Sequence, residues 1–383
     1  MADSPFALRL SHAASWVKCG SFVAMNRTPQ AAIVDGEQDH TVREEGTAMH
    51  EAAHWLFLGL EVSSGTKMAN GIVLDDEMVD AAQFYVDTVA SFDNGSMAAW
   101  VIERQLAAPR IHAQCGGTPD AFALYDNGPV HIRIVDLKGG YVPVEVFPNW
   151  QLMGYLAAVL DYAQGFDEDD TVVEFTIVQP RCYHRRGPVR SYRTTVGECR
   201  QYIEAMSVAA HVAMGDYAHA VSGPQCDGCA GRASCQVAHA AAMRALEMVG
   251  EPDVHDLPIV ALDYEMLRIE QAVAMLNARL TGLQAQAAHL IRKGAMLQHY
   301  AMESGTGRLN WLDENAEASA IAMGDLLGAN IRKPSRAITP LQAMKKLPQE
   351  FVEQYAQRKR GEVKLVRFDS NVAVKAFSHL KKD

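Results

Sequence analysis

Five polar side chains between Asp120 and Tyr155 have types and spacings suited to hydrolysing a phosphodiester. Asp136 and Lys138 are two residues apart, so in a strand they point to the same face. Gln151 and Tyr155 are four apart in a helical run and share one helix face. The carboxylates of Asp120 and Asp136 can hold Mg²⁺ or Mn²⁺, which activates a bound water. Lys138 would then position that water or stabilise charge developing on the phosphate.

The surrounding sequence predicts the elements that bring these side chains together. Apolar runs at 121–124 and 130–137 flank Asp126-Asn127-Gly128, which is a turn sequence typical of a β-hairpin. Asp120 then begins the first strand, and the Asp-x-Lys motif ends the second. A helical run over 149–163 follows. Taken alone, Asp-x-Lys also fits a surface hairpin with ordinary charges, because the motif is very short.

The order of three motifs resembles a known nuclease family. Gly-x-x-Asp ends at Asp120, Asp-x-Lys ends at Lys138 and Gln-x-x-x-Tyr ends at Tyr155, an order similar to that of PD-(D/E)XK nucleases of the RecB type. The resemblance implies that Asp120 and Asp136 bind the metal and that Lys138 is the catalytic lysine. It implies that Gln151 and Tyr155 lie near the DNA strand and the active site. Many relatives have Glu where this chain has Asp136, and the motif permits both.

Two further residues are candidate metal ligands on the same grounds. The apolar spacing of 41–59 predicts a helix that contains His50 and His54. RecB-like nucleases have a metal-binding His upstream of the strands, and His50, in a Gly-x-x-x-His context, resembles it better than His54. An imidazole ligand would favour Mn²⁺ alongside Mg²⁺. Glu103, in an expected strand over 100–106, is either a helper of the metal site or a plain strand charge.

Three cysteines close together form a second candidate ligand set. Cys226, Cys229 and Cys235 are separated by two and by five residues in a glycine-rich stretch, a density typical of metal or cluster binding. A zinc ribbon would bring a second Cys pair nearby, and none follows. The run resembles that of RecB-group nucleases with an iron–sulfur staple, which implies a [4Fe-4S] cluster with Cys19 as the distant fourth ligand.

Alternatives to that cluster stay open. The thiolates would also bind Zn²⁺, or they are simple buried thiols. Cys182 and Cys199 are rival fourth ligands, and Cys115 is expected to be structural.

Composition limits the class of protein. With 383 residues and 49% hydrophobic content, the chain can bury a full core and is expected to hold more than one domain. No apolar run reaches membrane-spanning length and no secretory signal is apparent, so we expect a cytoplasmic protein of a bacterium or a phage-infected host, without a membrane partner. The net charge of −11 argues mildly against nucleic acid, but 331–383 holds 13 Lys/Arg and 5 Asp/Glu, a balance of +8.

Other segments carry simpler expectations. Residues 181–193 hold five arginines and two tyrosines, which suit phosphate contacts and base stacking or a solvated hairpin. The basic tail from Arg332 would either contact DNA or form a solvated surface. The remaining expectations are a loop at 26–40, helices at 75–93, 196–220 and 261–300 (the last as one long helix or two), strands at 172–178 and 308–312, and a helix start at Thr339.

Together these observations predict an α/β (α+β) protein with a restriction-endonuclease-like core, in which helices flank a mixed central sheet. The nuclease domain would span 1–250, and a mainly helical extension 251–383. The expected activity is a Mg²⁺- or Mn²⁺-dependent DNA exonuclease that resects duplex ends in phage-type recombination or repair. Alternatives are a structure-specific endonuclease with the same site and a catalytically silent DNA- or protein-binding module. DNA, a single-strand annealing protein and further copies of the chain are the expected partners.

Overall fold

The computed structural model describes residues 5–36, 41–92, 100–126, 128–249, 258–297 and 300. The chain divides into two compact units, Met1–Glu303 and Ser304–Asp383, and the described residues all belong to the first. The predicted strand at 308–312, the helix start at Thr339 and the basic tail lie outside the described residues. The expected division after residue 250 therefore stays a prediction.

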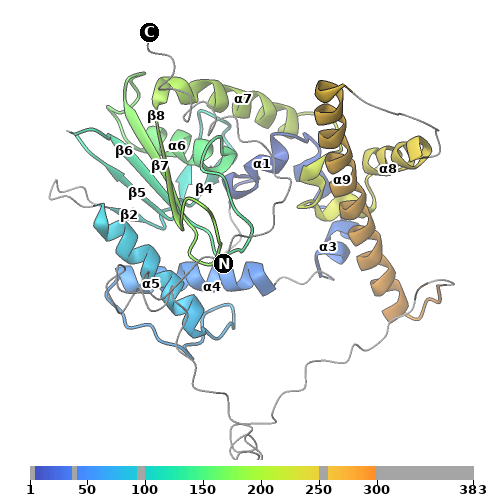
Figure 1. The fold of residues 1–383 in the computed structure, drawn as a ribbon, viewed down its shortest axis with the longest axis horizontal. Coiled ribbons are helices and arrows are strands. Elements are labelled where there is room, and N and C mark those ends of the chain that lie inside the picture. Colours follow the sequence, from blue (N-terminus) through green and yellow to red (C-terminus); the bar gives the residue numbers. More distant parts are fainter. Residues whose placement is uncertain are drawn as a thin grey trace, which may run out of the picture. The chain divides into compact units, whose positions relative to one another are not determined.

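A five-stranded mixed sheet forms the centre of the first unit, in the order β2-β5-β6-β7-β8 (Figure 1). β6 and β7 are parallel, whereas the β2–β5, β5–β6 and β7–β8 pairs are antiparallel. A smaller sheet has the order β1-β4-β3. The strands are β1 (Leu8–Arg9), β2 (Val101–Ile102), β3 (Leu106–Ala107), β4 (Cys115–Gly117), β5 (Ala121–Leu124), β6 (Ile132–Leu137), β7 (Val172–Val178) and β8 (Val189–Thr195).

Helices cover both faces of the central sheet, so the expected α+β class with a mixed sheet flanked by helices is confirmed. The helices are α1 (Ala13–Trp16), α2 (Phe22–Met25), α3 (Pro29–Gly36), α4 (Thr41–Phe57), α5 (Asp76–Ser91), α6 (Trp150–Tyr162), α7 (Val196–Met214), α8 (Gln236–Val249) and α9 (Ile259–Arg292), with 3-10 turns η1 (Leu10–His12), η2 (Pro224–Cys226) and η3 (Ala230–Ala233). Among the described residues, none of these helices has the length and apolar character needed to cross a bilayer.

The alternation of side chains along β6 separates two hydrophobic cores. Ile132 and Ile134 belong to the core that includes α6 and α7. Val135 and Leu137 belong to the core that includes α4 and α5. This is the period of two expected for a strand buried on both faces. Asp136 lies two residues after Ile134 in β6, so its side chain is on the same face of the sheet and points toward α6.

Several local expectations are confirmed by the element bounds. The predicted hairpin forms between β5 and β6, with Ala121 opposite Val135. The helix predicted over 149–163 is α6, and the structure adds that Asn149 caps it, because its side chain accepts hydrogen bonds from the backbone N–H groups of Gln151 and Leu152. The run predicted as the strand 172–178 is β7. The long helix is one helix, α9.

Two expectations are wrong. The predicted loop at 26–40 contains α3, which begins at Pro29, a residue tolerated in the first helical turn. The predicted strand over 100–106 is two short strands in different sheets, β2 and β3. Glu103 lies between them with φ of 48°, and this left-handed conformation ends the strand.

Candidate functional site

Three potential metal ligands meet at the end of the central sheet. His50 from α4, Glu103 after β2 and Asp120 before β5 each offer a ligand atom, and these atoms all lie within 4.8 Å of one another. His50 Nδ1 lies 3.3 Å from Asp120 Oδ1 and 3.5 Å from Glu103 Oε1. The side chain of Asp120 is 8% exposed, whereas those of His50 and Glu103 are 26% and 27% exposed. A buried carboxylate thus anchors a group that solvent still reaches.

Hydrogen bonds with backbone groups hold the two acidic residues of this group in place. Asp120 Oδ2 accepts a hydrogen bond of 2.6 Å from the backbone N–H of Leu137, which ties the start of β5 to the end of β6. The backbone N–H of Glu103 donates to the carbonyl oxygen of Asp120 at 3.0 Å. The positive φ of Glu103 is a strained conformation for a residue with a side chain, of the kind that clusters at functional sites.

A second set of side chains is joined by hydrogen bonds beside this group. Lys138 Nζ lies 2.9 Å from Asp136 Oδ2 and donates to Gln151 Oε1 at 2.9 Å. Gln151 Nε2 donates to Asp136 Oδ1 at 3.1 Å and to the hydroxyl of Tyr155 at 2.8 Å. The structure therefore brings together all four of these residues, as the shared strand face and the shared helix face predicted.

Asp136 is held mainly by this second set. It is not one of the three residues whose ligand atoms lie within 4.8 Å of one another. Its side chain is 2% exposed, and Oδ2 makes the ion pair with Lys138 without a well-directed hydrogen bond. That oxygen keeps the capacity to accept a further interaction.

A close approach between two glycines lets α4 reach the end of β6. A Cβ added to Gly139 would lie 3.1 Å from the Cα of Gly46 and closer still to the end of Met49. Gly46 is one helical turn before His50, so the absence of a side chain at 139 sets how near His50 can come to the sheet. Gly140 has no atom within 4 Å of an added Cβ.

Two residues hold the segment after Lys138: Gln179, which the sequence did not single out, and Arg181, the first of the arginine-rich run. The buried side chain of Gln179 donates to the carbonyl oxygens of Gly140 and Val142 and accepts from the backbone N–H of Val144. Arg181 pairs with Glu45 of α4 at 2.7 Å and stacks on the ring of Tyr141 at 4.3 Å. Neither role has a local signal in the sequence, because the partners of Gln179 in this segment lie 35 to 39 residues away and Glu45 lies 136 residues from Arg181.

The crowding of acids changes the titration of the site. Burial raises the pKa of Asp136 to about 6, although Lys138 opposes this shift. Burial also raises the pKa of Glu103. Burial alone would lower the pKa of His50, but Asp120 and Glu103 outweigh it and the pKa is raised well above its ordinary value.

The charge balance favours a bound cation. The three carboxylates of Glu103, Asp120 and Asp136 are accompanied by Lys138 and by His50, whose raised pKa favours its protonated form. Burial raises the pKa of Glu103 and of Asp136, so a further positive charge would stabilise their ionised forms. Carboxylate oxygens and one imidazole are ligands that a divalent cation accepts. The group can therefore hold a metal ion, as the sequence predicted.

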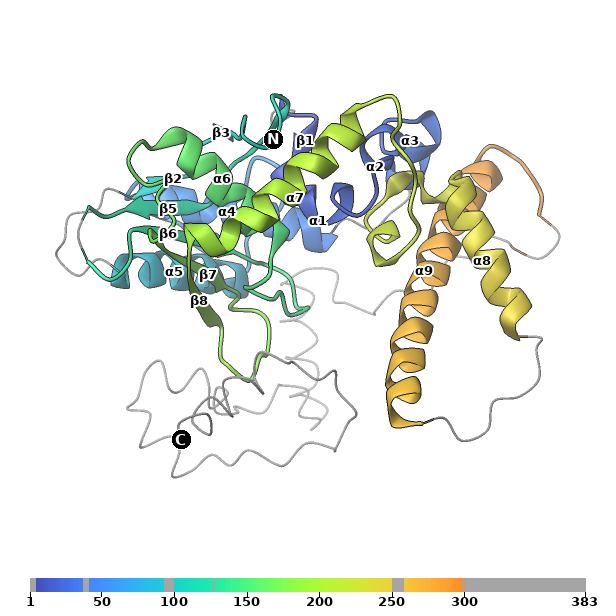
Figure 2. The same ribbon diagram turned by 90° about the horizontal axis from the view of Figure 1, so that it is seen from above.

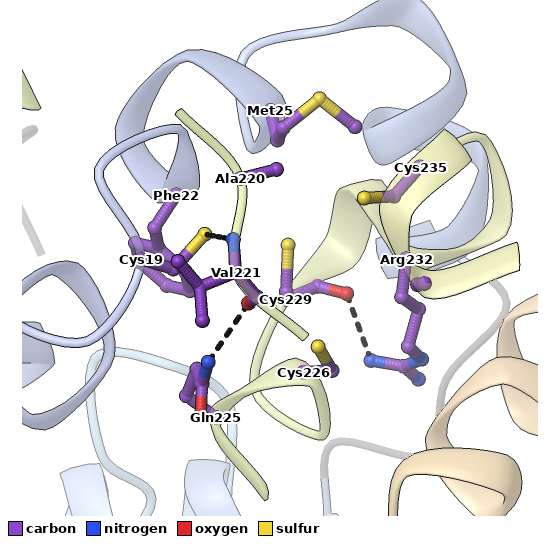
Figure 3. Close-up of a pocket in the computed structure, with 11 residues that line it drawn as sticks. Cys19, Phe22, Met25, Ala220, Val221, Gln225, Cys226, Cys229, Arg232 and Cys235 are labelled. Carbon is purple, nitrogen blue, oxygen red and sulfur yellow. Dashed lines mark hydrogen bonds between the residues drawn. The ribbon is translucent and has the colours of Figure 1, made fainter. Parts of the chain in front are cut away.

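The four cysteines of the second candidate set line one pocket (Figure 3). Cys19 comes from the turn between α1 and α2, and Cys226, Cys229 and Cys235 come from the segment around η2 and η3. Figure 3 shows all four sulfurs on the walls of the same space. Apolar side chains make up most of the remaining lining, namely Phe22, Met25, Ala220, Val221 and Ala238.

Hydrogen bonds from outside the set reach two of these sulfurs. Asn26 Nδ2 donates to Cys229 Sγ at 3.5 Å, and its Oδ1 accepts from the backbone N–H of Ala230 at 2.9 Å. The backbone N–H of Val221 donates to Cys19 Sγ at 3.5 Å. Such contacts orient sulfur ligands and tune what they bind. Asn26, which sequence reasoning missed, thus links α2 directly to the cysteine segment.

The rival cysteines lie elsewhere. None of Cys115, Cys182 and Cys199 lines this pocket. Burial raises the pKa of Cys115 and of Cys199 to about 12, and it also raises the pKa of the pocket residue Cys229 to about 11, so it is their position outside the pocket that sets Cys115 and Cys199 apart.

The arginine-rich run at 181–193 is used mostly within the fold. Arg181 pairs with Glu45, Arg190 donates to Gln179, and Arg193 pairs with Glu174. Arg185 and Arg186 are exposed. Most of the run therefore holds the sheet and its loops together, and any phosphate contact would fall to the tip of the β7–β8 hairpin.

One family model matches this chain. The model is described as "Protein of unknown function (DUF2800)" and matches residues 7–371. No curated protein matches the chain.

Proposed function

The chain belongs to the DUF2800 family, and we propose that it is a metal-dependent deoxyribonuclease of the PD-(D/E)XK class, RecB-like in its site. The observation that carries the proposal is the position of Asp136, Lys138, Gln151 and Tyr155 in one hydrogen-bonded set beside His50, Glu103 and Asp120. Helices α4 and α6 and the ends of the three strands β2, β5 and β6 supply these seven side chains. A surface hairpin with ordinary charges gives no reason for them to converge.

The side chains divide the chemistry between them. His50, Glu103 and Asp120 would hold Mg²⁺ or Mn²⁺, with Asp136 at the edge of the group. When bound, the ion supplies an activated water and offsets negative charge on the scissile phosphate. Lys138, placed by Asp136 and Gln151, presents its ammonium to the same space and stabilises charge that develops during attack.

Gln151 and Tyr155 would orient the lysine and the substrate strand. The carbonyl oxygen of the Gln151 side chain accepts from Lys138, and its amide nitrogen donates to Asp136 and Tyr155. Burial raises the pKa of Tyr155 well above its ordinary value, so its hydroxyl keeps its proton and can donate to a phosphate oxygen. The resemblance to RecB-like enzymes favours an exonuclease that resects duplex ends, acting with a single-strand annealing protein.

The cysteine pocket supports an iron–sulfur cluster as part of this proposal. All four thiols of the predicted set line one pocket, and most of its remaining lining is apolar. Such a pocket suits a cluster bridged by four thiolates, and Zn²⁺ held by the same thiols is the alternative. The cluster would then join Cys19 to three cysteines that lie more than 200 residues further along the chain.

The test is a cleavage assay with Mn²⁺ on end-labelled linear duplex and on closed circular DNA. An exonuclease degrades the linear DNA from its ends and leaves the circle intact, whereas an endonuclease linearises the circle. Asp120→Ala, Asp136→Ala and Lys138→Ala should each abolish cleavage while the protein keeps its circular-dichroism spectrum. Wild-type rates in Asp136→Ala, or no cleavage of either DNA by the wild-type protein loaded with metal, would refute the proposal.

A further inference from the structure

Helix α9 carries an unpaired apolar stripe with the spacing of a coiled coil. The stripe, called the α9 seam, repeats at alternating intervals of three and four residues over four heptads. Its members are Ile259, Leu262, Met266, Ile269, Val273, Leu276, Leu280, Leu283, Ala287 and Leu290. Eight of these side chains are between 37% and 85% exposed. A stripe this long and this apolar is typical of an interaction surface.

The seam lies on the opposite side of α9 from the part that packs in the fold. The buried residues of the helix are Met275, Ala278, Gly282 and Ala285, a row of mostly small side chains. A Cβ added to Gly282 would lie 3.1 Å from the backbone nitrogen of Ala233 in η3. Each residue of this row follows a seam residue by two positions in the sequence. Two residues correspond to about 200° around a helix of 3.6 residues per turn, so the buried row and the seam lie on opposite sides. Figures 1 and 2 both show α8 beside α9. The 3-10 turn η3 also packs against α9.

We propose that the α9 seam pairs with the α9 seam of a second copy of this chain, as an antiparallel two-stranded coiled coil. The inference goes beyond the proposed nuclease activity and does not depend on it. A two-fold axis between Val273 and Leu276 pairs Ile259 with Leu290, Leu262 with Ala287, Met266 with Leu283 and Ile269 with Leu280 of the second copy. Every layer is then apolar, as an isologous interface requires.

The charges beside the seam favour the antiparallel orientation. In a parallel pair, residue 265 of one helix faces residue 270 of the other, so Glu265 would meet Glu270 twice. In the antiparallel pair, Glu265 faces Gln286, and Glu270 faces Asn277. Asp263 faces Gln284 in the same way. Each acid thus meets an amide that can donate a hydrogen bond, and no like charges meet.

The self-association can be tested by sedimentation equilibrium on the full-length protein. We expect the wild-type protein to form a dimer. In the double variant Ile269→Asn, Leu280→Asn the dissociation constant should rise at least about tenfold, because both layers that pair residue 269 with residue 280 of the other copy lose their apolar contact. Val260→Asn is the matched control, since Val260 is 82% exposed but lies off the seam. A wild-type protein that stays monomeric up to roughly 100 µM, or a dimer that the double variant leaves unchanged, would overturn the proposal.

Two substitutions at one exposed position decide the orientation. In the antiparallel pair Gln284 faces Asp263, so Gln284→Lys should tighten the dimer and Gln284→Glu should weaken it. In a parallel pair residue 284 faces Arg279, and the order of the two variants would reverse. Circular dichroism should show the same helix content in both, because Gln284 is exposed. The reversed order, or equal affinities, would rule out the antiparallel arrangement.

Discussion

The ammonium of Lys138 donates to the side-chain oxygen of Gln151 at 2.9 Å, and this contact joins the end of β6 to the first turn of α6. The amide nitrogen of the same glutamine is shared between Asp136 and Tyr155. One side chain thus fixes the position of three candidate catalytic groups.

Removing that side chain should slow cleavage more than it destabilises the fold. We expect Gln151→Ala to reduce the rate by roughly 10- to 100-fold, the usual cost of losing a residue that orients a metal or catalytic group. Asn149→Ala is the matched control two residues earlier, because it removes the cap of α6 and should cost about 1 kcal/mol of stability without a comparable loss of rate. Turnover and thermal denaturation of both variants check this. A large loss of stability with an unchanged rate in Gln151→Ala would show it to be a packing residue.

Metal binding should distinguish two histidines on one helix. His50→Ala should weaken Mn²⁺ binding, measured by isothermal titration calorimetry, and should reduce the rise in melting temperature on adding Mn²⁺. His54→Ala, one turn further along α4, should leave both unchanged, since His54 is not part of the ligand group. Equal losses in the two variants would mean that α4 responds as a whole and that His50 is not a ligand.

The glycine approach between α4 and β6 gives a second way to disturb the metal group without touching a ligand. Gly139→Ala should push α4 away from the sheet end, because its Cβ would lie 3.1 Å from Gly46 Cα, and should therefore weaken Mn²⁺ binding and slow cleavage. Gly140→Ala should be neutral, since its Cβ meets no atom within 4 Å. If Gly139→Ala binds Mn²⁺ as tightly as Gly140→Ala, the approach of α4 does not control the site.

The cysteine pocket predicts which thiols hold iron. Anaerobically purified protein should be brown and contain roughly four irons per chain if the cluster is [4Fe-4S]. Cys19→Ser should lose iron and lower the melting temperature, because a cluster that closes so long a loop stabilises the fold by up to roughly 5 kcal/mol in the simple loop model.

Cys199→Ser is the control for that experiment, since Cys199 is a core thiol outside the pocket. It should keep its iron at full occupancy. Elemental analysis by mass spectrometry reads out both variants. Stoichiometric zinc without iron would contradict the cluster, and iron retained in Cys19→Ser would move the fourth ligand to another residue.

The sequence by itself determined the local elements and the motif residues. The turn signal at Asp126 and Gly128, the two apolar runs beside it and the helical run over 149–163 specify a hairpin followed by a helix, because these signals act within a few residues of one another. The spacings within Asp-x-Lys and Gln-x-x-x-Tyr specify which side chains share a face. The density of Cys226, Cys229 and Cys235 indicates a ligand set in the same local way.

Only the tertiary structure decided which distant residues meet. His50, Glu103 and Asp120 converge because the order of the sheet places β2 beside β5 and β5 beside β6, while α4 packs on that side of the sheet. The left-handed conformation of Glu103 has no signal in a sequence that reads as a plain strand. Cys19 reaches the other cysteines through the packing of α1 and α2 against the segment that follows α7. Such contacts depend on how whole elements pack, and the periodicity of a segment records only which of its own faces is buried.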